Sequence, residues 1–319
     1  MKREYENQVQ LLINCLPVIS EYVCFALKGG TAINLFYRNL PRLSVDIDLV
    51  YIKFSDRKEA FEEINDSLEN ISNKLKRLGF GTCIKSLDGI KKLICTDGNA
   101  TIKIEPNYLN RGTFYPPVKM QTAEKVQEKF GFSEINVISK QELFGGKICA
   151  ALDRQHPRDL FDVSLMIKNQ EIDEKIKDGF IIEMLCHNRN FYELLTPNLK
   201  DSEEIYKTQF KDMTDENFTY ADHISTFNKL VPLINSKLTD EDKNFLKDFV
   251  NLQVDFENCR FAGIEKLSAV RWKIQNLQKL KETQLEKFND LKRKNATALK
   301  DSQNIKKIKS RDDDFDRGR

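Results

Sequence analysis

The sequence predicts an α+β fold, in which a mixed β-sheet flanked by helices is followed by a mostly helical C-terminal domain. Residues 27–51 combine a glycine turn, a helix and an alternating strand. Residues 80–108 hold three strand-like runs separated by hairpin turns, and the chain beyond residue 170 has the apolar spacing of successive helices. We expect three parts: a core with the sheet at residues 1–122, a helical domain at residues 123–291, and a charged, mobile tail at residues 292–319.

Length and composition limit the class of protein. The 319 residues suffice for two domains, and the net charge of +2 gives no overall preference for nucleic acid. No apolar run is long enough to span a membrane, and the charged N-terminus lacks the apolar region of a signal peptide. Seven cysteines, an odd number without a Cys-x-x-Cys pair, indicate reduced thiols. We therefore expect a cytoplasmic protein without membrane contact.

The elements follow from periodicity and turn signals. Residues 5–16 predict a first helix that Pro17 ends, and residues 61–78 repeat as an amphipathic helix does. Strands are expected at residues 80–87, 91–96 and 100–108. The remaining elements are a loop at 109–122, a strand at 135–138, two helices within 140–167, helices at 173–186, 202–211, 222–235 and 240–252, and a long helix from Ile264 onward.

The stretch from Leu27 to Tyr51 has the clearest chemical pattern. Gly29 and Gly30 allow a sharp turn that can approach a ligand closely. Thr31 is placed to cap the helix that follows, which runs through Tyr37, and Pro41 prevents its continuation.

Asp46 and Asp48 share one face of the strand expected at residues 45–51, because side chains alternate along a strand. Their backbones are about 7 Å apart, and two carboxylates this close repel each other unless a cation lies between them. Mg²⁺ prefers such oxygen ligands and also binds phosphates, to which a glycine turn before a helix offers N–H groups. The pattern predicts a metal and phosphate site; the alternative is a solvated strand face after an ordinary turn.

Gly-Gly-Thr, a helix and Leu-Pro-Arg-Leu-Ser-x-Asp-x-Asp-Leu follow one another in this order. The order resembles the AbiEii and AbiGii type of nucleotidyltransferase toxin, a branch of the DNA polymerase β superfamily found in bacterial toxin–antitoxin and abortive-infection systems. The resemblance implies a nucleotidyltransferase-type sheet, a C-terminal domain that completes the active-site cleft, and an NTP substrate. It also implies a cognate antitoxin encoded nearby.

Sites of this superfamily need a third carboxylate, on a strand beside the Asp-x-Asp strand. We expect it to be Glu105, which faces outward from the third predicted strand. There it would complete the metal site and help to accept the proton of the attacking hydroxyl. The alternative is a surface ion pair between Glu105 and Lys103.

Two helices are expected around a break at residues 155–157, and charged residues gather there. Ser139 and Glu142 form a capping box for the first helix, whose apolar face includes Lys147. The spacing Lys-x6-Arg-x3-Arg-Asp-x2-Asp again resembles the AbiEii family, so we expect Lys147 to neutralise a triphosphate. A structural alternative pairs Arg158 with Asp162 on the helix surface.

Each candidate residue has an expected role. We expect the catalytic residues to be Asp46, Asp48, Glu105, Lys147 and Asp159, and the first three of them to bind the metal. We expect the nucleotide-binding residues to be Gly29, Gly30, Thr31, Asn34, Arg42, Ser44, Lys147, Arg154 and Arg158. The expected cofactor is Mg²⁺, with Mn²⁺ as the alternative.

The expected reaction transfers a nucleoside monophosphate from an NTP to an acceptor, with release of pyrophosphate. Analogy with the family favours RNA as the acceptor, at the 3′ end of tRNA. Two alternatives remain: transfer to a protein or a small molecule, and an NTP-binding toxin that acts by occlusion without turnover. Residues 292–311 are rich in lysine and arginine, and they are either a solvated appendage or a basic arm that attracts RNA phosphates.

Overall fold

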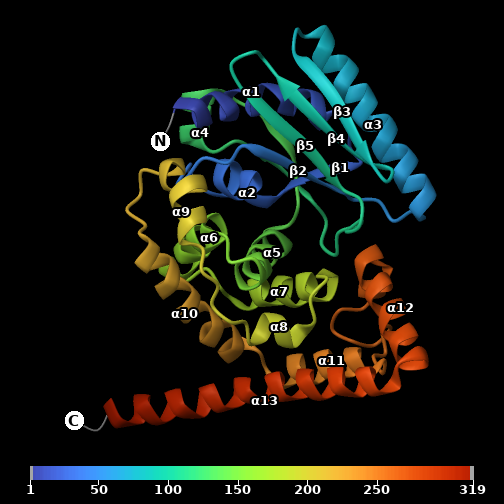
Figure 1. Cartoon of the computed structure of the whole chain (residues 1–319), viewed down its shortest axis with the longest axis vertical. Coiled ribbons are helices and arrows are strands. Elements are labelled where there is room, and N and C mark those ends of the chain that lie inside the picture. The colour runs from blue at the N-terminus through green and yellow to red at the C-terminus, as the bar shows by residue number, and fades with distance from the viewer. Residues whose placement is uncertain (1–2, 317–319) are drawn as a thin grey trace. The chain divides into compact units, whose positions relative to one another are not determined.

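The computed structural model describes the backbone of residues 3–316 and the side chains of residues 3–300. The chain forms two compact units (Figure 1). The first consists of Met1–Phe144 and Glu204–Asn217, and the second of Gly145–Glu203 and Phe218–Arg319. The division thus falls at residues 144 and 145 instead of 122 and 123, because strands formed by residues 118–137 join the first unit's sheet.

A mixed sheet organises the first unit. Its strand order is β3-β4-β5-β2-β1-β7-β6, with β2 parallel to β5 and antiparallel to β1. The strands are β1 (Phe25–Lys28), β2 (Asp46–Tyr51), β3 (Gly81–Leu87), β4 (Ile90–Thr96), β5 (Thr101–Asn107), β6 (Val118–Gln121) and β7 (Glu134–Val137). The predicted α+β fold with a mixed sheet is confirmed.

Helices α1 (Arg3–Ser20) and α3 (Arg57–Arg77) cover one face of this sheet. The sulfur of Cys15 in α1 lies 3.6 Å from that of Cys95 in β4, and Ser72 in α3 is 2.8 Å from Thr82 in β3. Thr82 and Cys95 are opposite each other in the β3–β4 pair, so both helices lie on the same side. We call this side the covered face.

The first unit also contains α2 (Gly29–Ala32), the π-helical turn η1 (Ile33–Tyr37), α4 (Glu124–Phe130) and the start of α5 (Lys140–Asp153). A later segment returns to it with most of α9 (Glu203–Gln209) and the 3₁₀ turn η2 (Lys211–Met213). Within this unit the amide of Leu43 donates to the carbonyl of Met213, and the hydroxyl of Thr214 donates to that of Pro41, both at 2.7 Å.

The second unit is helical. It contains the rest of α5, α6 (Pro157–Lys168), α7 (Glu174–Cys186), α8 (Phe191–Leu195), α10 (Tyr220–Lys237), α11 (Asp240–Asn251), the turn η3 (Ile264–Lys266), α12 (Ser268–Thr283) and α13 (Leu285–Asp316). Helices α8, α10, α11 and α12 pack on α13. None of the helices within the described residues is long and apolar enough to cross a membrane.

Three predicted boundaries are wrong. Helix α1 continues through Pro17 to Ser20, because burial of Val18 and Ile19 outweighs the lost hydrogen bond. Residues 109–122 are not all loop, since they include β6, an edge strand that pairs with β7. The long helix expected from Ile264 onward is interrupted at Gln284, between α12 and α13.

The expected tail also differs from the prediction. Residues 292–300 continue α13, and Asn295, Ala298 and Leu299 are buried. The side chain of Asn295 accepts a hydrogen bond from the backbone N–H of Tyr192 at 3.0 Å. The side chains of the remaining basic residues, from position 301 on, lie outside the described part of the chain.

Candidate active site

Asp46 and Asp48 lie on β2, the middle strand of the sheet. Both aspartates are half-buried. Ile47 and Leu49, which alternate with them along the strand, are completely buried on the covered face. The alternation therefore presents the two carboxylates on the side opposite α1 and α3. We call this side the carboxylate face.

The glycine turn lies directly against Asp48. Strand β1 ends at Lys28, and Gly29 begins α2 with a φ of +76°, a conformation that side chains disfavour. A Cβ at Gly29 would lie 2.3 Å from Oδ2 of Asp48. Two features therefore require glycine at this position: the positive φ of the backbone and the lack of space for a side chain beside the carboxylate of Asp48.

Thr31 does not cap the helix, contrary to the prediction. The helix already begins at Gly29, and Thr31 is completely buried within it. Its hydroxyl contacts the hydroxyl of Ser44 at 3.1 Å and donates to the backbone carbonyl of Asp46. Thr31 therefore fixes the glycine turn to the start of β2. The helix ends at Tyr37, four residues before Pro41.

Arg42 and Ser44 support the turn from the inside. A Cβ at Gly30 would lie 2.8 Å from Nη2 of Arg42 and 2.9 Å from Oγ of Ser44. Arg42 is 2% exposed, and its guanidinium donates to the carbonyl of Leu43 at 2.9 Å. Asn34 is buried as well, and its amide donates to the carbonyl of Gly30 at 2.9 Å. These candidates hold the turn in shape and place one positive charge behind it.

Glu105 lies where the sequence analysis expects the third carboxylate. In the parallel β2–β5 pair, Glu105 is opposite Asp48 and Lys103 is opposite Asp46. The carboxylate of Glu105 forms an ion pair with Lys92 of β4 at 3.3 Å, so the alternative of a surface ion pair holds for Glu105 with Lys92 as the partner instead of Lys103. Residues directly across two strands are closer than residues two apart on one strand, which favours Lys92.

Within the described residues no three His, Cys, Asp or Glu side chains form a cluster that could hold a metal ion. Mg²⁺ is commonly bound through one or two carboxylates, with water and substrate phosphates as its other ligands. Asp46 and Asp48 are sufficient for that mode, and the participation of Glu105 stays a prediction.

The charged residues of α5 and α6 form a second cluster, in the helical unit. The ammonium of Lys147 is 2.8 Å from Oδ1 of Asp159 and 3.1 Å from Oδ2 of Asp162. All three side chains are at most 6% exposed. Asp162 was not among the candidates, although its i,i+3 spacing from Asp159 places both carboxylates on one face of α6.

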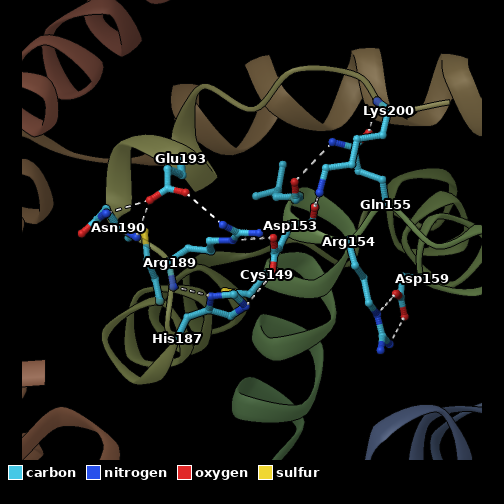
Figure 2. Close-up of polar contacts among 12 residues, drawn as sticks. Cys149, Asp153, Arg154, Gln155, Asp159, His187, Arg189, Asn190, Glu193 and Lys200 are labelled. Atoms are coloured by element: carbon cyan, nitrogen blue, oxygen red, sulfur yellow. Dashed lines mark hydrogen bonds and ion pairs between the residues drawn. The ribbon is translucent and has the colours of Figure 1, made fainter. Parts of the chain in front are cut away.

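Arg154 closes this cluster (Figure 2). Its Nε and Nη2 donate to the two carboxylate oxygens of Asp159, at 2.5 and 3.0 Å. Burial by itself would raise the pKa of Asp159, but the charges of Lys147 and Arg154 outweigh it and hold that pKa well below its usual range. The side chain of Arg154 is 62% exposed, so one edge of the cluster faces solvent.

Arg158 and His156 lie at the predicted break between α5 and α6. Pro157 takes the first position of α6, as expected, and Nδ1 of His156 accepts from the backbone N–H of Arg158 at 3.1 Å. His156 therefore caps the helix, and Arg158 is half-buried in its first turn. At the start of α5 the backbone N–H of Glu142 donates to Oγ of Ser139 at 3.2 Å, which is one of the two bonds of the expected capping box, and Oγ of Ser139 donates to the Glu142 carboxylate at 3.0 Å.

The fold and the site together define a class of protein. A helix entered through glycine, an Asp-x-Asp strand beside it and a mixed sheet make a nucleotidyltransferase unit. The model of one family, described as the nucleotidyl transferase AbiEii toxin of type IV toxin–antitoxin systems, matches residues 10–273. The chain belongs to this family, so it is a nucleotidyltransferase toxin with a nucleotide substrate and an antitoxin partner.

One solved structure similar to this chain is MenT4, a nucleotidyltransferase toxin from Mycobacterium tuberculosis H37Rv. The TM-score is 0.57 and the sequence identity 13%, over 88% of this chain and 94% of that chain. At this identity the likeness concerns the fold. No curated protein matches the chain.

Proposed function

We propose that this toxin transfers a nucleoside monophosphate from an NTP to RNA, in a reaction that depends on Mg²⁺ or Mn²⁺ and takes place in the cytoplasm. The 3′ end of tRNA is the acceptor that the family resemblance favours. The observation that carries the proposal is the contact of the glycine turn with Asp48, since it joins a phosphate-binding turn to a carboxylate pair.

The residues present fit a divalent cation. Asp46 and Asp48 supply carboxylate oxygens on one strand face, and a side chain at Gly29 would fill the space beside Asp48. Asp46 and Asp48 would hold the ion, with Glu105 as a third ligand. When bound, a divalent cation neutralises phosphate charge and polarises the phosphoryl group.

The chain's own groups would then position the reactants. Backbone N–H groups at Gly29 and Gly30 would bind phosphate oxygens, with the charge of Arg42 behind them. An acceptor hydroxyl attacks the α-phosphate, the bond to the β-phosphate oxygen breaks, and pyrophosphate leaves. Glu105 would accept the hydroxyl proton, and the ammonium of Lys92 lies 3.3 Å from its carboxylate.

The cluster in the helical unit would supply positive charge for phosphate groups. Asp159 holds the guanidinium of Arg154 by two hydrogen bonds, and a guanidinium fixed in this way is suited to a phosphate contact. Lys147 would act through Asp159, since it is buried between two carboxylates. Arg158 would supply a further charge at the start of α6.

A labelling experiment tests the proposal. The protein is incubated with each NTP labelled at the α-phosphate, together with total bacterial RNA or with lysate, and the labelled product is identified. We expect label in RNA, none when the label is on the γ-phosphate, and none with Asp46→Asn. Label in a protein or a small molecule would show that this molecule, and not RNA, is the acceptor. NTP binding without any labelled product would favour inhibition by occlusion.

A further inference from the structure

The pairing of the strands places charged side chains in two rows across the carboxylate face. One row runs from Lys85 in β3 through Lys92 in β4 and Glu105 in β5 to Asp48 in β2. The second runs from Ile94 in β4 through Lys103 in β5 to Asp46 in β2. Residues paired across strands point to the same side, so both rows share one face. Three lysines thus lead from the edge of the sheet to the carboxylate pair.

These lysines differ from the lysine on the covered face. Lys85 and Lys103 are exposed and have no ion-pair partner among the residues that the structure describes, whereas Lys91, one residue before Lys92, pairs with Glu69 of α3 at 2.7 Å. The side chain of Lys92 is 43% exposed beside Glu105. Uncompensated positive charge therefore lies on the side of the sheet that carries Asp46 and Asp48.

We propose that Lys85, Lys92 and Lys103 form a track that binds the phosphodiester backbone of the acceptor RNA and directs its 3′ hydroxyl toward Asp46 and Asp48. The inference rests on the proposed function, and it adds the surface that holds the acceptor. All of these residues belong to the sheet of the first unit.

The spacing and composition of the track suit a nucleic-acid backbone. Neighbouring strands are about 4.8 Å apart, so Lys85 lies roughly 14 Å from Asp48 at the backbone, a span for a short single strand. Lysine is a point charge on a flexible stem, and it contacts phosphates without reading bases. Strands β3, β4 and β5 contain no aromatic residue on which a base could stack. The track should therefore bind RNA with little preference for sequence.

The test measures RNA binding as a function of salt concentration. The double variant Lys85→Gln with Lys103→Gln is compared with a matched control, Lys58→Gln with Lys91→Gln, which removes two charges from α3 and the covered face. The probe is a single-stranded RNA oligonucleotide with a free 3′ hydroxyl. Lys92 is left unchanged because it is paired with Glu105.

We expect the track variant to bind RNA several-fold more weakly at low salt. The negative slope of log K against log salt concentration should become shallower by about 1.4, because each single-strand phosphate contact contributes roughly −0.7. The control should keep the wild-type slope, and NTP affinity and melting temperature should not change in either variant. Lys103→Arg, which keeps the charge, should retain the wild-type slope.

Two failures can be told apart. If wild-type protein labels RNA and the track variant binds and labels RNA as the control does, the track is refuted and the proposed function stands. If wild-type protein labels only a protein or a small molecule, the RNA acceptor is refuted, and the track with it.

Discussion

Aspartates serve two different purposes in this protein. Asp46 and Asp48 are half-buried on a strand face, beside a turn without side chains. Asp159 and Asp162 are buried and compensated by Lys147 and Arg154. A carboxylate pair that is ready for a cation is costly in its absence, whereas a compensated cluster stabilises the native state as long as every partner is present.

The first prediction at this scale concerns Asp46→Asn and Asp48→Asn. Each variant should lose nucleotidyl transfer, because one ligand of the cation is replaced by a neutral amide, and each should fold normally, because repulsion between the two carboxylates is removed. Transfer of α-phosphate label at saturating Mg²⁺, together with thermal melting, measures both effects. Wild-type transfer by either variant would refute the metal assignment.

The second concerns Lys147→Met, which keeps the length of the side chain and removes its charge. Asp159 and Asp162 would then lack a buried partner, and the free energy of unfolding should fall by about 3–5 kcal/mol. Arg154→Gln is the comparison: Asp159 keeps Lys147 as its buried partner and the Arg154 side chain is 62% exposed, so the free energy of unfolding should fall by less than in Lys147→Met.

Urea denaturation measures the stability of both variants, and NTP binding is measured in parallel. Under the proposed function NTP affinity falls in both. A Lys147→Met protein that is destabilised but binds NTP normally would make this lysine purely structural.

The residues of β2 were predictable from the sequence, since a strand repeats every two residues and its acidic positions can be read directly. The partners of Lys147 and Glu105 were only partly predictable. Asp159 and Asp162 reach Lys147 across the break between two helices, and Lys92 reaches Glu105 across strands. Such contacts depend on tertiary structure, which a single sequence does not contain.

At the scale of elements, two glycines of α5 have different roles. A Cβ at Gly145 would lie 2.2 Å from the backbone carbon of Gly179 in α7, so the two helices touch through their backbones. A Cβ at Gly146 would lie 3.1 Å from the end of the Glu183 side chain, which can move away. Gly145 therefore serves the packing of α5 on α7, and Gly146 meets only a side chain.

Gly145→Ala should destabilise the protein by about 1–3 kcal/mol or more, because backbone atoms cannot yield to the added methyl group. Gly146→Ala is the matched control on the same helix. It should be neutral or stabilising by up to about 1 kcal/mol, since alanine favours a helix over glycine. Denaturation midpoints of the two variants test whether α5 and α7 touch at Gly145. Equal midpoints would contradict this contact.

The sequence predicted elements better than their ends. Strands β3, β4 and β5 begin and end within a residue or two of their predicted positions, because hairpin turns separate them from one another. The end of α1 and the start of α2 were wrong, because burial of Val18 and Ile19 and the contacts of Thr31 outweigh the local signals of Pro17 and of a capping residue.

At the scale of the whole chain, the helical unit extends into the segment that the sequence assigned to a tail. Charge dominates residues 292–319, and it conceals the apolar positions at Ala298 and Leu299 that are buried. The return of residues 204–217 to the first unit was not predictable either. No local pattern indicates that a short helix belongs to an earlier part of the chain.

Truncation tests the extent of this unit. Removal of all residues after Leu291 should lower the melting temperature by several degrees, because the buried side chains of Asn295, Ala298 and Leu299 are then missing. The backbone N–H of Tyr192 also loses its hydrogen-bond acceptor. Truncation after Lys300 keeps these residues and is the control. Equal melting temperatures for the two truncated proteins would restore the view of a dispensable tail from residue 292.

The return of residues 204–217 has a consequence for the timing of synthesis. The loop that carries Arg42 and Ser44 is tied down by Met213 and Thr214, so a ribosome must translate some seventy residues beyond Phe144 before that loop can be anchored. At roughly 5–20 residues per second this delay lasts on the order of seconds. Under the proposed function, a nascent toxin lacks an anchored Arg42 loop until Met213 and Thr214 have emerged, and an antitoxin has that interval in which to meet it.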